Sequence, residues 1–174
     1  AASDVYKRQE YAGATSTSLW ALGHEMHHSY FARSAHPAGG NAGWIDEALA
    51  SWRDNSYPRI ANLGGRHHTK MASRSVYDRV IDMKAYREGA DIIGHLDYLT
   101  QGQGGMKSFL KVFYFKNVFR PYNTSIFKEE LEDYFQRDFT ALFNTYIYGK
   151  ASKEDLKLPQ ANLKLHSHAR NPHY

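Results

Sequence analysis

Apolar residues recur at three- and four-residue spacing along most of the chain, a pattern typical of helices that bury one face. Six stretches follow this pattern, with glycine, proline or capping residues at their ends: 16–33, 44–55, 75–99, 106–119, 124–136 and 138–149. A convincing run of alternating polar and apolar positions is absent, although a short strand before Thr15 fits the pattern. The sequence therefore predicts a mainly α-helical protein.

The same pattern divides the chain into one helical unit and two polar ends. Residues 1–14 are polar and without a clear period, which indicates a disordered or non-native N-terminal segment. Residues 15–150 hold all the predicted helices, and Gly89 marks either a break or a close packing point within the third of them. Residues 151–174 form a polar tail whose histidines are able to bind metal adventitiously.

The composition excludes several kinds of site. The 174 residues include 10 histidines and no cysteine, which rules out a disulfide scaffold, thiolate metal ligands, an iron–sulfur cluster and a cysteine nucleophile. Any metal ligands must therefore be His, Asp or Glu side chains. The formal net charge is a mild +4, and no apolar run approaches the ~18–20 residues that span a bilayer. Stable membrane insertion is therefore not expected.

The residues His24-Glu25-Met26-His27-His28 form an H-E-x-x-H motif within the first predicted helix. Residues four apart project from the same helix face, so the imidazoles of His24 and His28 can approach one Zn²⁺ ion. Glu25 lies beside them rather than between them, which suits a general base that acts on water. His27 also lies close to that face, three residues after His24, and is interpreted as a flanking residue.

Glu47 is the candidate third ligand. It follows His28 after a gap over 29–46, in which a loop and a returning helix can bring its carboxylate back to the two histidines. This set resembles the gluzincin metallopeptidases, whose third ligand is a glutamate on the helix after the H-E-x-x-H helix. The gap and the aromatic-x-x-Glu lead-in from Trp44 most resemble the group of aminopeptidase N and leukotriene A4 hydrolase.

The resemblance extends over about 16–149. Within it, Tyr86-Arg87-Glu88-Gly89-Ala90 resembles the Tyr-Glu-Lys-Gly segment of that group, whose tyrosine stabilises the oxyanion of the tetrahedral intermediate. The resemblance implies the helical lobe of a thermolysin-like zincin, one Zn²⁺ ion held by the histidine pair and Glu47, and Glu25 and Tyr86 as catalytic residues. It implies zinc-dependent, aminopeptidase-like hydrolysis of peptide or protein substrates by metal-activated water.

Two features of that family have no counterpart in the chain. The Gly-x-Met-Glu-Asn segment that reads the substrate backbone normally precedes the zinc helix, and nothing like it occurs in residues 1–15. The family's β-rich N-terminal domain is missing as well, so the chain is interpreted as an N-terminally truncated fragment. Exopeptidase and endopeptidase activity both stay open. The compartment stays unknown, and a missing upstream signal peptide would favour an extracytoplasmic location.

Several residues near the motif have a plainer interpretation. Ligating histidines usually donate their second ring N–H to a carboxylate, which Asp46 or Asp54 could supply, but solvated aspartates are the favoured interpretation. The plainer interpretation of Tyr86 is a helix residue with its hydroxyl at the surface. Four other histidines are interpreted as surface or packed residues rather than ligands: His36, His67, His68 and His95.

Other function classes are weighed against the peptidase hypothesis. The main alternative is a degenerate peptidase-like module that binds zinc or a partner without cleavage, and intact Glu25 argues against it. A zinc hydrolase that acts on another electrophile, such as an epoxide, is a second alternative. The stretch 107–120 interleaves lysines with aromatic residues and is interpreted as a core helix, so neither a nucleic-acid partner nor a membrane surface is expected. Substrate preference and oligomeric state stay open.

Overall fold

The computed structural model describes residues 9–11, 14–39, 41–64, 69–72 and 81–150, and it is mostly helical, as the sequence predicted. The α-helices are α1 (Leu22–His28), α2 (Gly43–Asp54), α3 (Ala90–Thr100), α4 (Gly105–Asn117), α5 (Thr124–Phe135) and α6 (Thr140–Tyr146). Short π-helical turns form η2 (Ser29–Ser34) and η3 (Ala85–Gly89), and 3-10 turns form η1 (Leu19–Ala21) and η4 (Gln101–Gln103).

The strands within the described ranges are short and form two separate pairs. β1 (Gln9–Tyr11) runs antiparallel to β2 (Ala14–Ser16), and β3 (His36–Pro37) runs parallel to β4 (Pro121–Tyr122). The first pair matches the strand that the sequence allowed before Thr15, and it crosses the boundary predicted at residue 14. The polar tail over 151–174 lies outside the described residues.

Two predicted helices differ from the structure, one at its start and end and the other at the residues after Val80. The stretch predicted as helical from residue 16 begins only at Leu19, as a 3-10 turn, and its end from Ser29 onward is π-helical. Residues 75–80 lie outside the described part of the chain, and the two residues after Val80 are not helical. There the Asp82 carboxylate accepts the N–H of Lys84 at 3.0 Å. This local turn competes with helical hydrogen bonds at the residues directly before η3.

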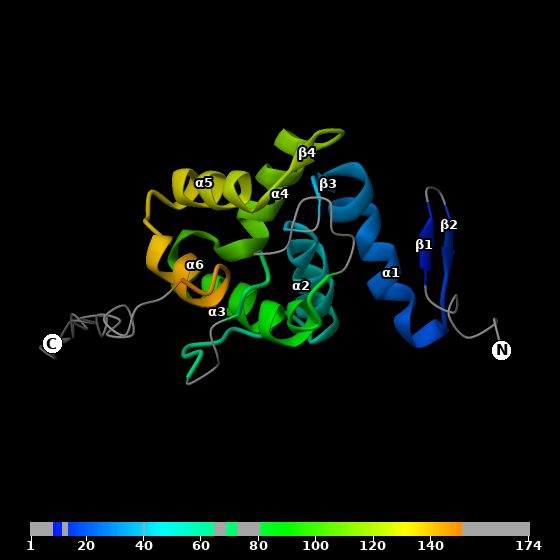
Figure 1. Cartoon of the computed structure of the whole chain (residues 1–174), viewed down its shortest axis with the longest axis horizontal. Helices are drawn as coiled ribbons and strands as arrows, with labels where there is room; N and C mark the ends of the chain where they lie inside the picture. Colours follow the sequence, from blue (N-terminus) through cyan, green and yellow to red (C-terminus); the bar gives the residue numbers. More distant parts are fainter. Residues whose placement is uncertain (1–8, 12–13, 40, 65–68, 73–80, 151–174) are drawn as a thin grey trace, which may run out of the picture.

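Helix α2 is the central element of the fold. It contacts α1 on one side and η3 and α3 on another, and Figure 1 shows it in the middle of the molecule with α5 and α6 far from α1. Most of its residues are buried, including Trp44, Ile45, Leu49 and Trp52, as expected for a helix that is covered all round. Asp46 and Glu47 are buried among them, so their carboxylates need partners within the protein.

The aromatic core behind α2 holds the first helix in place. The Trp44 indole donates to Thr124 Oγ1 at 3.0 Å, which connects α2 to the start of α5. The buried Tyr122 hydroxyl donates to the carbonyl of Phe31 at 2.6 Å, which connects β4 to the turn that follows α1. These bonds join segments far apart in the sequence. They fix the position of α1 against α2.

Gly89 lets η3 approach α2 closely. A side chain at Gly89 would place its Cβ 2.8 Å from the Cβ of Ala48, nearer than real carbon atoms approach. The glycine also lies where η3 changes from π-helical to the α-helical geometry of α3. The predicted close packing point at Gly89 is confirmed, whereas the alternative prediction of a break is wrong, because the helix continues through Gly89 with φ −61° and ψ −45°. The close approach brings Tyr86 on η3 next to Glu47 on α2.

Helix α4 has the arrangement predicted for a core helix. Phe109 and Phe113 are buried against the aromatic core, and Lys107 and Lys111 lie on the exposed side. No helix among the residues that the structure describes is long and apolar enough to cross a membrane.

Candidate metal centre

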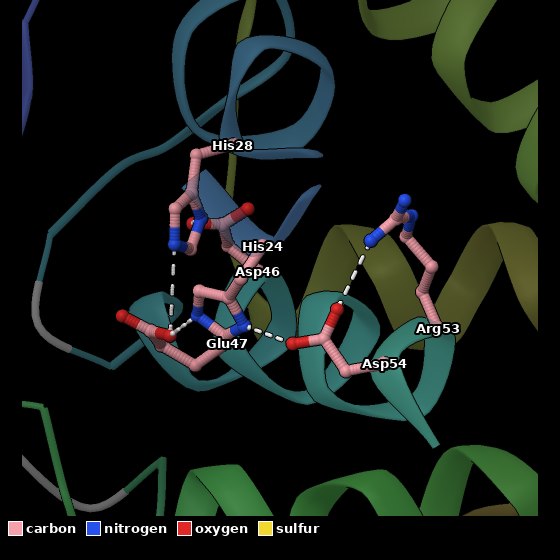
Figure 2. Close-up of polar contacts among 6 residues, drawn as sticks. All are labelled: His24, His28, Asp46, Glu47, Arg53 and Asp54. Atoms are coloured by element: carbon pink, nitrogen blue, oxygen red, sulfur yellow. Dashed lines mark hydrogen bonds and ion pairs between the residues drawn. The ribbon is translucent and has the colours of Figure 1, made fainter. Parts of the chain in front are cut away.

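The three predicted ligands lie together where α1 crosses α2. His24 and His28 are four residues apart on α1, so both imidazoles project toward α2, which carries Glu47 (Figure 2). One potential ligand atom from each of the three side chains lies within 4.8 Å of the other two. His24 Nε2 lies 3.2 Å from Glu47 Oε2, and His28 Nε2 lies 3.8 Å from the same oxygen. The sequence prediction that these three side chains meet is therefore confirmed.

The other ring nitrogen of each histidine contacts an aspartate. His24 Nδ1 lies 2.7 Å from Asp54 Oδ2, and His28 Nδ1 lies 2.6 Å from Asp46 Oδ2. The interpretation of both aspartates as merely solvated is wrong. Asp54 lies two helical turns after Glu47 and so shares its face of α2, while Asp46 is buried beneath His28. The sequence does not show how α1 and α2 cross, so it cannot distinguish these carboxylates from solvated ones.

When both histidines are neutral, their contacts with the aspartates leave a lone pair on each Nε2 atom. An ionised carboxylate only accepts hydrogen bonds, so each Nδ1 donates, and a neutral imidazole then has a lone pair on Nε2. Both lone pairs face Glu47 Oε2, which also carries lone pairs and negative charge. A proton or a metal cation between these atoms would remove the repulsion. Nitrogen and carboxylate donors in this arrangement suit Zn²⁺.

The pKa shifts agree with this electrostatic picture. The hydrogen bond to Glu47 is the largest cause that raises the pKa of His24, and the bond to Asp54 adds to it, whereas burial opposes both. Burial raises the pKa of Asp46, and its hydrogen bond to His28 counteracts part of that effect. Without a metal ion, the contact with Glu47 therefore favours the protonated form of His24.

The predicted catalytic residues lie beside these ligands. Glu25 is buried on α1 and lines the same cleft as the three ligands. The ring of Tyr86 stacks with that of His24, with centroids 6.2 Å apart. Burial raises the pKa of Tyr86, and the charge of Glu47 and a hydrogen bond to it raise this pKa further. The structure thus brings Tyr86 to the ligand cluster rather than leaving it at the surface.

An open cleft of about 1630 Å³ lies over the cluster. Its walls combine polar residues with exposed apolar side chains, among them Trp20, Tyr57 and Met83. A volume of this size accommodates an extended peptide as well as a small molecule.

His27 does not join the cluster. Its ring stacks on Phe31 with centroids 5.5 Å apart, and its buried Nδ1 has no hydrogen-bond partner. Burial lowers the pKa of His27 to about 4, and the charge of His28 contributes in the same direction. The prediction that His27 is a flanking residue is confirmed.

Replacing His27 with Leu is expected to make the metal-free protein less sensitive to acid. Unfolded His27 takes up a proton below about pH 6.5, but the folded protein resists this down to about pH 4, so stability is lost across that window. With pKa values of about 4 folded and 6.5 unfolded, His27 lowers the free energy of unfolding by about 2 kcal/mol at pH 5 and by almost nothing at pH 7.5. Urea unfolding of both proteins with a chelator at these two pH values measures the difference. An equal acid-induced loss in both proteins would contradict the expectation.

Other histidines behave as predicted where the structure describes them. His95 Nδ1 lies 2.7 Å from the carbonyl of Ile60, which makes it a packed residue. His36 lies in β3, and His67 and His68 lie outside the described residues. In the described ranges, the cluster on α1 and α2 is the only group of three or more possible ligands.

Arg53 is a residue of the site that the sequence analysis missed. Its Nη1 donates to Asp54 Oδ1 at 3.0 Å, next to the bond that Asp54 makes with His24 (Figure 2). An arginine beside an aspartate on an exposed helix turn is common, so the sequence holds no signal that separates it from a surface pair.

Comparison of the chain with protein-family models, curated proteins and solved structures gives no match. The interpretation of the site therefore rests on the residues and their geometry.

Proposed function

We propose that the chain is the helical lobe of a gluzincin-type metallopeptidase and hydrolyses peptide bonds in a zinc-dependent reaction. The observation that supports this most is the paired orientation of the two histidines. Asp54 and Asp46 hold the Nδ1 atoms, so both Nε2 lone pairs face Glu47 Oε2 at 3.2 and 3.8 Å. Carboxylate partners of this kind fix the tautomer and orientation of metal-binding histidines.

His24, His28 and Glu47 would hold the metal ion, and their donor set fits Zn²⁺. Two imidazole nitrogens and one carboxylate oxygen are a common set in catalytic zinc sites, which keep a further position open. Zinc in such a site polarises a carbonyl and lowers the pKa of a water molecule to ~7. The open cleft over the cluster is consistent with access for water and substrate.

Two residues of the chain would supply the remaining chemistry. Glu25 would accept the proton of the attacking water and return it to the leaving amine, because it is a carboxylate that lines the cleft and is not one of the three ligands. Tyr86 would donate a hydrogen bond to the oxyanion that develops on the substrate carbonyl. Its raised pKa keeps the hydroxyl protonated, as a donor must be.

Removal and return of zinc test the proposal. Treatment with a chelator should abolish cleavage of a mixed peptide library, and one equivalent of Zn²⁺ should restore it, with mass spectrometry as the measurement. The double variant His24→Ala/His28→Ala should not regain activity. A variant with Gln at His166, His168 and His173 controls for zinc held by the tail and should behave like the wild type. Zinc binding without cleavage would favour the non-catalytic module, and absence of zinc binding would overturn the proposal.

A further inference from the structure

The two histidines of the proposed metal site are held by carboxylates in different environments. The Asp46 side chain is 7% exposed, so packing alone restricts its rotation. The Asp54 side chain is 38% exposed, so one of its rotations would turn the carboxylate into water and away from His24. Asp54 therefore needs another interaction if it is to hold the His24 ring as firmly as Asp46 holds the His28 ring.

Arg53 provides that interaction. Its Nη1 donates to Asp54 Oδ1 at 3.0 Å, while Asp54 Oδ2 accepts from His24 at 2.7 Å. Each oxygen of the carboxylate thus has its own partner, which opposes rotation in either direction. Figure 2 shows His24, Asp54 and Arg53 in a row, with the arginine on the side of Asp54 that faces away from Glu47. The guanidinium also brings a positive charge next to a group of carboxylates.

Gly23 leaves the space that the guanidinium occupies. A Cβ at this position would lie 2.4 Å from Arg53 Nη1, 2.8 Å from Nη2 and 3.0 Å from Cζ. Gly23 immediately precedes His24 on α1, so the arginine reaches from α2 to the backbone beside the ligand that it supports. A side chain at residue 23 would displace the flexible end of Arg53 rather than the helix backbone.

We propose that Arg53 is a positioning residue of the metal site, that it acts through Asp54 on His24, and that Gly23 is required for this contact. Arg53 holds one oxygen of Asp54, so the other oxygen stays on the Nδ1 hydrogen of His24 and Nε2 stays directed at Glu47. This inference rests on the proposed metal site. It goes beyond that proposal because neither Arg53 nor Gly23 belongs to the proposed ligands or catalytic groups.

Metal titration of single and double variants tests the contact. Loss of a direct carboxylate partner typically weakens metal binding 10- to 100-fold. Arg53 contacts Asp54 rather than His24 itself, so Arg53→Met should have a smaller effect and raise the dissociation constant for Co²⁺ about three- to tenfold. Gly23→Ala should raise it by a similar factor, although alanine favours a helix more than glycine does. The double variant should be no weaker than either single one, because both remove the same contact.

A second measurement reports on His24 directly. In nitrogen-resolved NMR spectra of the zinc-loaded protein, Arg53→Met should increase the solvent exchange of the His24 Nδ1 hydrogen. The His28 Nδ1 hydrogen, whose partner Asp46 is buried, should be unaffected and is the internal control. Arg53→Lys keeps the charge and should recover most of the lost Co²⁺ affinity. Lys111→Met removes a positive charge from the exposed side of α4 and should leave both readouts unchanged.

The outcomes separate this inference from the proposed function. If the wild type binds Co²⁺ and Arg53→Met or Gly23→Ala binds it equally well, the inference is wrong and the metal site stands. Additive losses in the double variant would show that Gly23 acts independently of Arg53, which also overturns the inference. If the wild type does not bind Co²⁺ or Zn²⁺ at all, the proposed function and the inference fail together.

Discussion

Replacing Glu25 with Gln is expected to abolish peptide hydrolysis while the protein still binds zinc. General-base catalysis by a positioned side chain contributes about 10²- to 10⁴-fold to the rate, so kcat should fall by about that factor. Glutamine has nearly the same shape as glutamate but cannot accept the proton of the attacking water. Because Glu25 is buried, this shape-conserving change is preferable to a truncation that would leave a cavity.

Zinc should stay bound because Glu25 is outside the ligand cluster. Successive residues of a helix point in directions about 100° apart, so Glu25 cannot share the face that His24 and His28 present to α2. The structure assigns only His24, His28 and Glu47 to the cluster within the residues it describes. Metal content and the zinc dissociation constant should therefore match those of the wild type.

Steady-state kinetics on a peptide identified from the library, combined with metal analysis, measures both effects. The matched control is Glu129→Gln, which removes an exposed carboxylate on α5, outside the cleft, and should leave kcat unchanged. A zinc-loaded Glu25→Gln protein with full activity would show that Glu25 is not the base. Loss of zinc together with activity would instead indicate that Glu25 supports the metal site.

The ligand cluster could be predicted because it depends on local geometry and on one packing contact. The spacing of His24 and His28 fixes their common face in any α-helix, and a gap over 29–46 leaves few ways for a second helix to return. The periodic apolar positions predicted that second helix, and the structure has it as α2. The site could thus be inferred from residues that lie on two predicted helices.

The supporting residues could not be predicted, because they depend on how the two helices cross. Asp54 contacts His24 only because the face of α2 that carries Glu47 turns toward α1, and Asp46 contacts His28 only because it is buried at the same crossing. The contact of Arg53 with Gly23 depends on the same crossing of α1 and α2. The non-helical residues directly before η3 have a different cause, a local turn at Asp82 that apolar periodicity does not reveal.

Replacing Glu47 with Gln is expected to weaken zinc binding far more than any change in the supporting residues. Zinc sites with four protein ligands bind with an apparent free energy of about 10–16 kcal/mol, which is about 2.5–4 kcal/mol for each ligand. Loss of a carboxylate ligand should therefore raise the dissociation constant about 100- to 1000-fold. Competition with a chromophoric chelator measures this change. Equal zinc affinity in the variant would exclude Glu47 as a ligand.

The same substitution has an opposite effect on the metal-free protein at the two ends of the pH range. The bond to Glu47 is the main cause of the raised pKa of His24, so protonated His24 stabilises the wild type below about pH 6.5. That contribution disappears as the pH rises through the raised pKa. Glu47→Gln removes it, so the variant should be less stable than the wild type at pH 6 when a chelator is present.

At pH 9 the order should reverse. A larger share of His24 is neutral at pH 9 than at pH 6, and in the neutral form its Nε2 lone pair faces the Glu47 carboxylate at 3.2 Å without a proton between them. A glutamine amide can donate a hydrogen bond to that nitrogen and has no charge to desolvate. Urea unfolding at both pH values should therefore show the two stability curves crossing. A variant that is less stable at both pH values would mean that Glu47 supports the fold through packing rather than through its charge beside His24.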